Sequence, residues 1–213
     1  SGGGEHGRRG TPGTQPEPVS GGGEHGRRGS SIPVGRLGEV LAAVWHSPKP
    51  VVARVGGAAR AGGLGIIAAA DIAVAAASAT FAFAEVRIGV IPAVISATVL
   101  PRLTSRAAAE LFLTGDVFDA ARAAAAGLVT AAVPDEELDG AVTRYVESLV
   151  RGAPGALAGA KELLRRAPAA SLDDDLVALT ELSVSYFRSP EAAEGMAAFR
   201  EKRTPFWGNP AAL

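Results

Sequence analysis

The stretch from Lys49 to Asp71, KPVVARVGGAARAGGLGIIAAAD, decides the fold of this chain. It opens with valines, whose β-branched side chains suit a strand, and the glycines at 56–57 then interrupt the run. The tripeptide Ala-Gly-Gly at 61–63 begins an apolar run that predicts a helix over 63–70. Glycines at a helix N-terminus leave backbone N–H groups facing outward, with the positive end of the helix dipole behind them. The stretch therefore predicts a strand, a turn and a helix that together can bind an anion or a developing oxyanion.

Composition limits the class of protein. The chain has 213 residues, of which 47% are hydrophobic, so it is long and apolar enough to form one sizeable domain with a buried core. Its net charge of −1 argues against nucleic acid or a membrane surface as the main partner. It contains no cysteine, which excludes disulfides and a thiolate nucleophile, and its three histidines lie in no metal-ligand spacing. With no signal peptide and no apolar run of membrane-spanning length, we expect a cytoplasmic protein without a metal site.

The first 31 residues differ from the rest of the chain. The decapeptide SGGGEHGRRG occurs at 1–10 and again at 20–29. Glycine, proline and charge dominate this segment, so it lacks the apolar surface that offsets the entropy cost of ordering, and we expect it to be disordered. From residue 32 the pattern predicts alternating strands and helices, followed by helices alone. We therefore expect an α/β core over 32–150 and a C-terminal helical region over 151–213.

Hydrophobic spacing and turn residues predict the individual elements. Strands are expected at 49–55, 71–76, 80–83 and 128–133. Helices are expected at 34–46, 63–70, 92–100, 105–113, 119–126, 136–150, 155–166 and 172–187. A last helix is expected to start at Ser189-Pro190, with Ser189 as the N-cap and Pro190 in the first helical position.

Glu85 is the main acid–base candidate. It lies in FAFAEVRIGVIP, residues 81–92, where a carboxylate in apolar surroundings holds a proton more readily than in water and suits general acid–base catalysis. It could instead pair with Arg87 or cap the next turn. The glycines at 61–63 likewise admit a purely structural role, since glycine lets a helix pack closely on its neighbour. Arg60 beside them is either a contact for a ligand phosphate or a solvated loop residue.

Four stretches, in this order along the chain, resemble the enoyl-CoA hydratase/isomerase (crotonase) superfamily. They are KPVVARVGGAARAGGLGIIAAADIAVA at 49–75, FAFAEVRIGVIPA at 81–93, LTGDVFDAARAAAAGLVTAAVP at 113–134 and SPEAAEGMAAFREKRTPFW at 189–207. Each motif alone is weak, whereas the ordered set is specific. The resemblance implies an α/β fold of the ClpP/crotonase type, a spiral of ββα units with a C-terminal helical region, assembled as a homotrimer or hexamer.

The resemblance also implies the substrate and the site. An acyl-CoA would bind with its thioester oxygen held by backbone N–H groups, and no cofactor or metal would be needed because CoA arrives with the substrate. Gly62 would supply one N–H, a loop resembling residues 20–24 would supply a second from Gly23, and Glu85 would be the acid/base. The implied substrate-binding residues are Arg60, Ala61, Gly63 and Gly65.

The sequence departs from the family pattern in two places. Hydratases of this family carry a first glutamate three residues after the middle glycine, where this chain has Gly65. One glutamate alone resembles the isomerase arrangement, in which a single base moves a proton along the acyl chain. The strands that precede the Lys49 region in the family are not found here, so we expect an N-terminally incomplete fold. An acyl-CoA enzyme and an inactive acyl-CoA-binding remnant both remain open, as does a thioesterase or dehalogenase relative.

Overall fold

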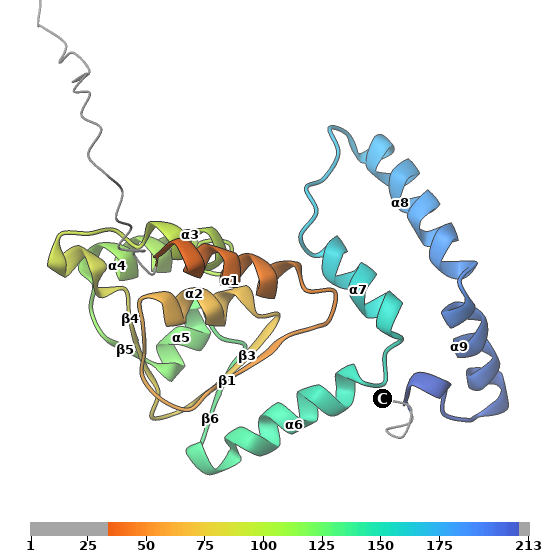
Figure 1. Ribbon diagram of the computed structural model, residues 1–213, viewed down its shortest axis with the longest axis horizontal. Helices are drawn as coiled ribbons and strands as arrows, with labels where there is room; N and C mark the ends of the chain where they lie inside the picture. Colours follow the sequence, from red (N-terminus) through yellow and green to blue (C-terminus); the bar gives the residue numbers. More distant parts are fainter. Residues whose placement is uncertain (1–33, 209–213) are drawn as a thin grey trace, which may run out of the picture. The chain divides into compact units, whose positions relative to one another are not determined.

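The computed structural model describes residues 34–208 (Figure 1). Its internal contacts divide the chain into Ser1–Ser31 and Ile32–Leu213, and all described residues belong to the second unit. The expectations for the repeated decapeptide and for Gly23 lie outside the described residues.

Helices and strands alternate first, and helices alone follow β6 (Figure 1). The strands are β1 (Val52–Val55), β2 (Ala59–Arg60), β3 (Ile72–Ala76), β4 (Thr80–Ala82), β5 (Phe118–Asp119) and β6 (Ala131–Val133). The α-helices are α1 (Val34–His46), α2 (Gly62–Ala69), α3 (Ala93–Val99), α4 (Ser105–Thr114), α5 (Ala120–Ala126), α6 (Leu138–Leu149), α7 (Pro154–Leu163), α8 (Leu172–Phe187) and α9 (Pro190–Glu201). Short 3₁₀ helices are η1 (Ala84–Ile88), η2 (Asp135–Glu137) and η3 (Phe206–Gly208).

The strands form two small sheets. One has the order β1-β3-β6 and is parallel throughout, with Val52 opposite Ile72 and Val74 opposite Ala131. The other has the order β2-β4-β5, in which β2 is parallel to β4 and β4 is antiparallel to β5. Parallel neighbours need a crossover connection, which α2 supplies between β1 and β3. The predicted α/β class is therefore confirmed.

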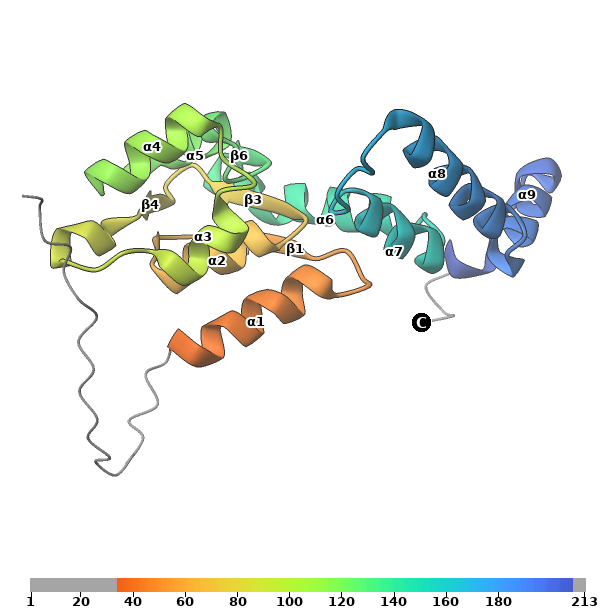
Figure 2. The same ribbon diagram turned by 90° about the horizontal axis from the view of Figure 1, so that it is seen from above.

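The core is rich in alanine and has a small aromatic centre. Phe83 contacts Phe112 and Phe118, with ring centroids 4.5 and 6.0 Å apart, and Phe81 stacks on Phe118 at 5.6 Å. Around these rings, buried alanines let helices approach closely, and α1, α2 and α3 pack against one another (Figure 2). The largest fully buried side chains are those of Phe81, Phe83, Leu64, Leu138, Val74 and Val99.

Most predicted elements are present with shifted ends, and a few short elements were not predicted. The helices at 34–46 and 172–187 have the predicted limits, and Ser189 caps α9 by accepting a hydrogen bond from Ala192 N–H. The strand predicted at 128–133 is limited to β6, because the N–H groups of Leu128 and Val129 donate back to Ala123 O at the end of α5. The strand predicted at 49–55 starts only at β1, and the sequence missed the two-residue strands β2 and β5 and the turn η1.

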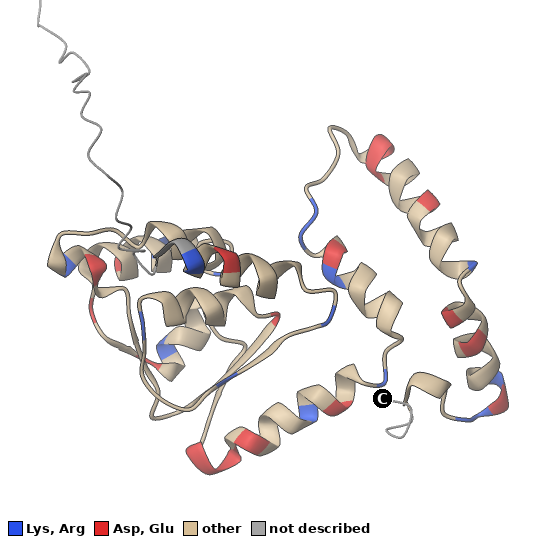
Figure 3. Cartoon of the chain, in the orientation of Figure 1, with Lys and Arg blue, Asp and Glu red and all other residues tan. Residues whose placement is uncertain are grey.

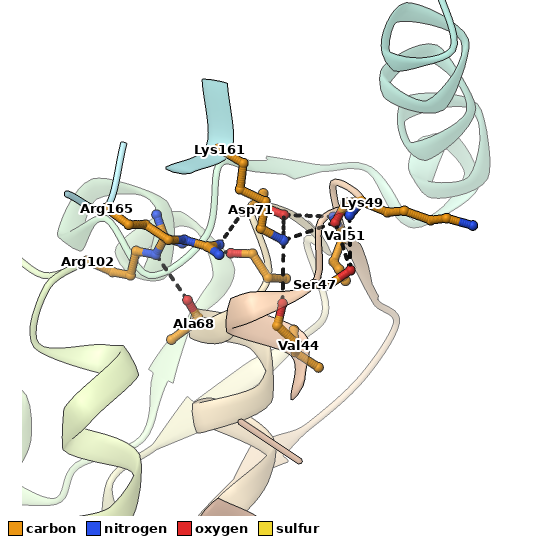
Figure 4. A network of polar contacts seen from close by, with 10 residues as sticks. Val44, Ser47, Lys49, Val51, Ala68, Asp71, Arg102, Lys161 and Arg165 are labelled. Carbon is orange, nitrogen blue, oxygen red and sulfur yellow. Dashed lines mark hydrogen bonds and ion pairs between the residues drawn. The ribbon is translucent and has the colours of Figure 1, made fainter. Parts of the chain in front are cut away.

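A buried ion cluster ties α7 to the first sheet (Figure 4). The Asp71 carboxylate accepts a hydrogen bond from Val51 N–H at 2.8 Å and forms ion pairs with Lys161, at 2.7 Å, and Arg165. Lys161 is only 5% exposed, and its ammonium also donates to Lys49 O at 3.0 Å. The buried ammonium is thus paired and hydrogen-bonded, as a buried charge must be.

Two arginines, Arg102 and Arg165, stack on Trp45 beside this cluster. The guanidinium carbon of Arg165 lies 4.5 Å from the centre of the Trp45 ring, and that of Arg102 lies 5.2 Å from it. Arg102 donates to Ala68 O and Ala70 O, both at 3.0 Å, at the C-terminal end of α2, where carbonyls lack helical partners. Burial and the nearby positive charge of Arg165 lower the pKa of Arg102. Together with these stacked arginines, Asp71 has a structural role: it joins its own segment to Val51 before β1 and to Lys161 and Arg165 in and after α7.

The helices after β6 differ from one another in how much of their surface is buried. Helix α6 packs on β1 and β3, where Leu138 and Ala141 form a small second core with Val74 and Ala76. In contrast, the described part of the chain buries none of the sixteen residues of α8. Within residues 34–208, every helix is too short or too polar to cross a lipid bilayer.

Candidate active site

The glycine turn begins α2 through a strained residue. Ala61, the N-cap, has φ of +47° and ψ of −125°, a region that L-residues other than glycine rarely occupy. Its carbonyl accepts a hydrogen bond from Leu64 N–H at 3.0 Å. The two N–H groups before Leu64, those of Gly62 and Gly63, have no acceptor inside the helix. The start of α2 therefore presents donors without an intrahelical acceptor at the positive end of a helix that carries no charged side chain (Figure 3).

Packing explains two of the glycines in this helix and leaves one without such a reason. A Cβ at Gly62 would lie 3.1 Å from a methyl of Leu37 in α1, and a Cβ at Gly65 would lie 2.7 Å from Ile95 Cγ2 in α3. A Cβ at Gly63 would meet nothing closer than 4.0 Å among the described residues. The purely structural role of glycine is thus supported at positions 62 and 65, and it is compatible with N–H groups at the helix start that lack an intrahelical acceptor.

Glu85 lies in η1 and presents an unpaired carboxylate oxygen. Its backbone is fixed by the turn that follows, since Val90 N–H donates to Glu85 O at 3.1 Å and Gly89 has φ of +76°. The side-chain oxygen Oε2 is buried, yet it has no hydrogen-bond partner among the described residues. Arg87 does not pair with Glu85, because its guanidinium binds Asp116 and the carbonyl of Thr114. An unpaired buried carboxylate oxygen is costly and uncommon in folded proteins, and a catalytic role is one explanation for it.

The second sheet brings the glycine turn and Glu85 to the same edge. Strands β2 and β4 are parallel and in register, with Arg60 opposite Ala82. Gly62 follows Arg60 by two residues, and Glu85 follows Ala82 by three. The carboxyl ends of parallel strands meet at one edge of a sheet, so both segments leave the sheet from that edge. The sequence pointed to both groups, but it missed β2, the strand that joins them, because two residues carry no periodicity.

Arg60 is largely engaged by the sheet itself. Its guanidinium donates to Ala59 O at 2.7 Å, to Thr80 O at 2.6 Å and to Thr80 Oγ1 at 3.0 Å. These bonds reinforce the pairing of β2 with β4. Arg60 is exposed, so a substrate contact through its remaining donor capacity stays a prediction.

The other site residues divide into three groups. Ala61, Gly62 and Gly63 are consecutive at the start of α2, whereas Gly65 is buried between α1 and α3. The second N–H donor expected from Gly23 lies outside the described residues. Among residues 34–208, no group of three or more His, Asp or Glu side chains is arranged to hold a metal ion.

Fold and site together define a crotonase-fold α/β protein. An enoyl-CoA hydratase/isomerase from Marinobacter aquaeolei has a similar structure, with a TM-score of 0.78 and 33% identity over 83% of this chain and 67% of its own. An enoyl-CoA hydratase from Shewanella pealeana gives a TM-score of 0.75 at 33% identity, covering 82% of this chain and 65% of its own. The family model for enoyl-CoA hydratase/isomerase matches residues 23–210, and the chain belongs to that family.

Curated relatives agree with this assignment. A Thermus thermophilus protein whose name places it among the enoyl-CoA hydratases is 36% identical over 163 residues, which cover 76% of this chain. Carnitinyl-CoA dehydratase from Citrobacter koseri is 32% identical over 172 residues, covering 78% of this chain and 66% of its own length. The chain spans just under two thirds of these relatives, 64% in the Thermus protein.

Proposed function

We propose that this chain acts on an acyl-CoA thioester, with the N–H of Gly62 holding the thioester oxygen and Glu85 as the single acid/base. The observation that carries the proposal is the unpaired, buried Oε2 of Glu85 at the sheet edge from which α2 also starts. The names of the relatives support the substrate class, because enoyl-CoA hydratase and carnitinyl-CoA dehydratase are both named for acyl-CoA substrates. CoA enters as part of the substrate, and the proposed reaction uses no other cofactor.

The proposed reaction shifts a double bond in a 3-enoyl-CoA. The Glu85 carboxylate takes a proton from C2, and the electron pair moves toward the thioester oxygen to give a dienolate. The Gly62 N–H stabilises the negative charge on that oxygen, a contribution of about 3 kcal/mol for one such donor. Glu85 then returns the same proton to C4, which yields the 2-enoyl-CoA and restores the carboxylate. One carboxylate is enough, because one proton moves and no water is added.

A second oxyanion donor from Gly23 is part of the proposal. The family match begins at residue 23, which supports a place for this loop in the site. Deleting residues 1–31 tests it: we expect turnover to fall by about 10²-fold if one N–H is lost. Unchanged turnover would exclude Gly23 as a donor.

The experiment that tests the main proposal compares wild type with Glu85→Gln on 3-enoyl-CoA and 2-enoyl-CoA substrates. We expect Glu85→Gln to lower kcat by about 10²- to 10⁴-fold, because the amide cannot carry the proton. The control is Glu147→Gln, an exposed position in α6, which should leave turnover unchanged. Equal activity of Glu85→Gln and wild type would contradict the proposed role.

An inactive acyl-CoA-binding protein is the second candidate. Gly65 favours it, because the family's first glutamate is missing there. Binding of an acyl-CoA by calorimetry without turnover of either substrate would establish this alternative.

We also propose assembly as a homotrimer or hexamer through the C-terminal helices. Most of the exposed large apolar side chains in residues 151–208 lie on α8 and α9, and a cavity between these helices and Trp207 is lined mainly by apolar residues. The exposed apolar side chains on these two helices include Leu172, Leu176, Val177, Phe187, Met196 and Phe199. Large exposed apolar patches mark interaction sites, and a second copy of the chain would cover this one.

A further inference from the structure

The space beside Gly65 is already filled. A Cβ built there would lie 2.7 Å from Ile95 Cγ2, 3.0 Å from Ile95 Cβ and 3.2 Å from Leu41 Cδ1. Ile95 Cβ is attached directly to the backbone of α3, and a β-branched side chain has little rotamer freedom in a helix. No side chain larger than hydrogen therefore fits at position 65 unless α3 shifts or Ile95 is shortened.

The contact between α2 and α3 is held firmly at this point. Ile95 and Leu41 are 3% and 4% exposed, so both belong to the core. Thr98 of α3, which is also buried, donates from Oγ1 to Gly65 O at 3.0 Å and to Ile95 O at 3.2 Å. A hydrogen bond and close packing thus hold α3 against the backbone of residue 65.

The glycine at this position is explained by its neighbours. Glycine within a helix is less favourable than alanine, because it loses more backbone entropy and buries no side chain. The close approach of Ile95 accounts for its presence, since alanine would already place an atom within 2.7 Å. Residues 65 and 95 therefore share one volume, and Ile95 occupies it.

We propose that Ile95 is a specificity-determining residue, because its side chain takes the volume that a side chain at position 65 would need and so restricts the site to one carboxylate. This inference rests on the proposed function. Water addition to a 2-enoyl thioester has two requirements: one group must hold and deprotonate the water, and a proton must be delivered to C2. Two carboxylates can divide these tasks between them. A double-bond shift needs one carrier for one proton. The substrate class is accordingly 3-enoyl thioesters, whose C4 can accept the proton.

Thermal unfolding of Gly65→Ala, Ile95→Ala and the double variant tests the shared volume. We expect each single change to lower Tm by about 5 °C, the first by overpacking and the second by leaving a cavity. The decrease in Tm of the double variant should be clearly smaller than the sum of the two single decreases, because the new methyl group at position 65 fills part of the space left by Ile95. The control is Gly140→Ala in α6, where a Cβ would meet nothing closer than 3.7 Å, and it should not lower Tm.

Hydration of a 2-enoyl-CoA by Gly65→Glu and by Gly65→Glu/Ile95→Ala tests the specificity role. We expect the single variant to be destabilised and inactive in hydration, and the double variant to fold and gain hydration by about 10²-fold over wild type. Additive Tm losses, a Gly65→Glu variant as stable as wild type, or a folded double variant without hydration would each overturn the proposal. The proposed function fails in a different experiment: it is wrong if Glu85→Gln isomerises a 3-enoyl-CoA as fast as wild type.

Discussion

Helices α2 and α8 differ in what surrounds them. Helix α2 has eight residues, of which five are buried, and it packs against both α1 and α3. Helix α8 has sixteen residues, and the described part of the chain buries none of them. The limits of α2 depend on contacts with other segments, whereas α8 begins by local rules: Ser171 accepts a hydrogen bond from Asp174 N–H, and three aspartates follow in the first turn.

The two helices differ in how far their own chain covers them: α2 is largely buried, whereas α8 is exposed in the described part of the chain. Helix α2 is buried by its own chain, so packing against α1 and α3 holds the N–H groups at its start in place. A helix of sixteen residues is marginal alone in water and gains most of its stability from packing, so the exposure of α8 agrees with the assembly proposed above.

The largest effect is expected at Asp71, which ties α7 to the core. Asp71→Ala leaves the ammonium of Lys161 buried without its counter-charge, and we expect a loss of about 3–5 kcal/mol in the free energy of unfolding, measured in urea. The matched control is Asp139→Ala, which breaks the exposed pair with Arg54 and should cost about 0–1 kcal/mol. Equal losses in the two variants would show that the buried cluster does not hold α7.

Truncating one leucine in each helix measures the contrast directly. Leu64 in α2 is fully buried, and Leu64→Ala should cost about 3 kcal/mol because it leaves a cavity. Leu172 in α8 is 72% exposed, and Leu172→Ala should change the free energy of unfolding by less than about 0.5 kcal/mol when measured on the monomer. A large loss at Leu172 in the monomer would mean that α8 is covered by its own chain.

Polar substitution on α8 should affect assembly and leave the fold of the core intact. We expect Leu176→Ser/Val177→Ser to lower the molar mass measured by light scattering toward that of a monomer, because apolar surface drives association. The control is Asp173→Ser/Thr180→Ser, at exposed polar positions of the same helix. Wild type that is already monomeric would contradict the proposed trimer.

The smallest effect is expected at the two strained residues, one beside each region. Ala61 before α2 has φ of +47°, and Lys202 after α9 has φ of +54°. Replacing either by glycine should stabilise the chain by about 1 kcal/mol, since glycine adopts these conformations without the Cβ penalty. The control is Ala58→Gly, at a residue with φ below zero, which should not stabilise the chain. Destabilisation by Ala61→Gly would show that the alanine methyl is needed for packing.

The sequence predicted the parts of the molecule that follow local rules. The ends of α1 and α8, the cap at Ser189 and the order of strands and helices came from spacing and turn residues. The sequence also singled out the glycine turn and Glu85 as a candidate site, because glycine and an isolated carboxylate in an apolar stretch are chemically distinctive, and their catalytic roles stay a prediction. The missing glutamate at Gly65 was also visible in the sequence.

Contacts between distant residues could not be read in this way. The two-residue strand β2 exists only through its pairing with β4, and that pairing brings the start of α2 and Glu85 to one edge. The partners of Asp71 are 90 and 94 residues away in the chain, at Lys161 and Arg165. No local pattern marks either arrangement.

The sequence by itself determined the family, the helix that begins at a glycine turn and the occurrence of glutamate at position 85 but not at position 65, since these depend on residue type and spacing. Only the tertiary structure decided that Ile95 and Leu41 fill the space beside Gly65 and that Glu85 keeps an unpaired oxygen among the described residues. The physical reason is that packing and desolvation arise between segments distant in sequence, where the volume of one side chain sets what another position can hold.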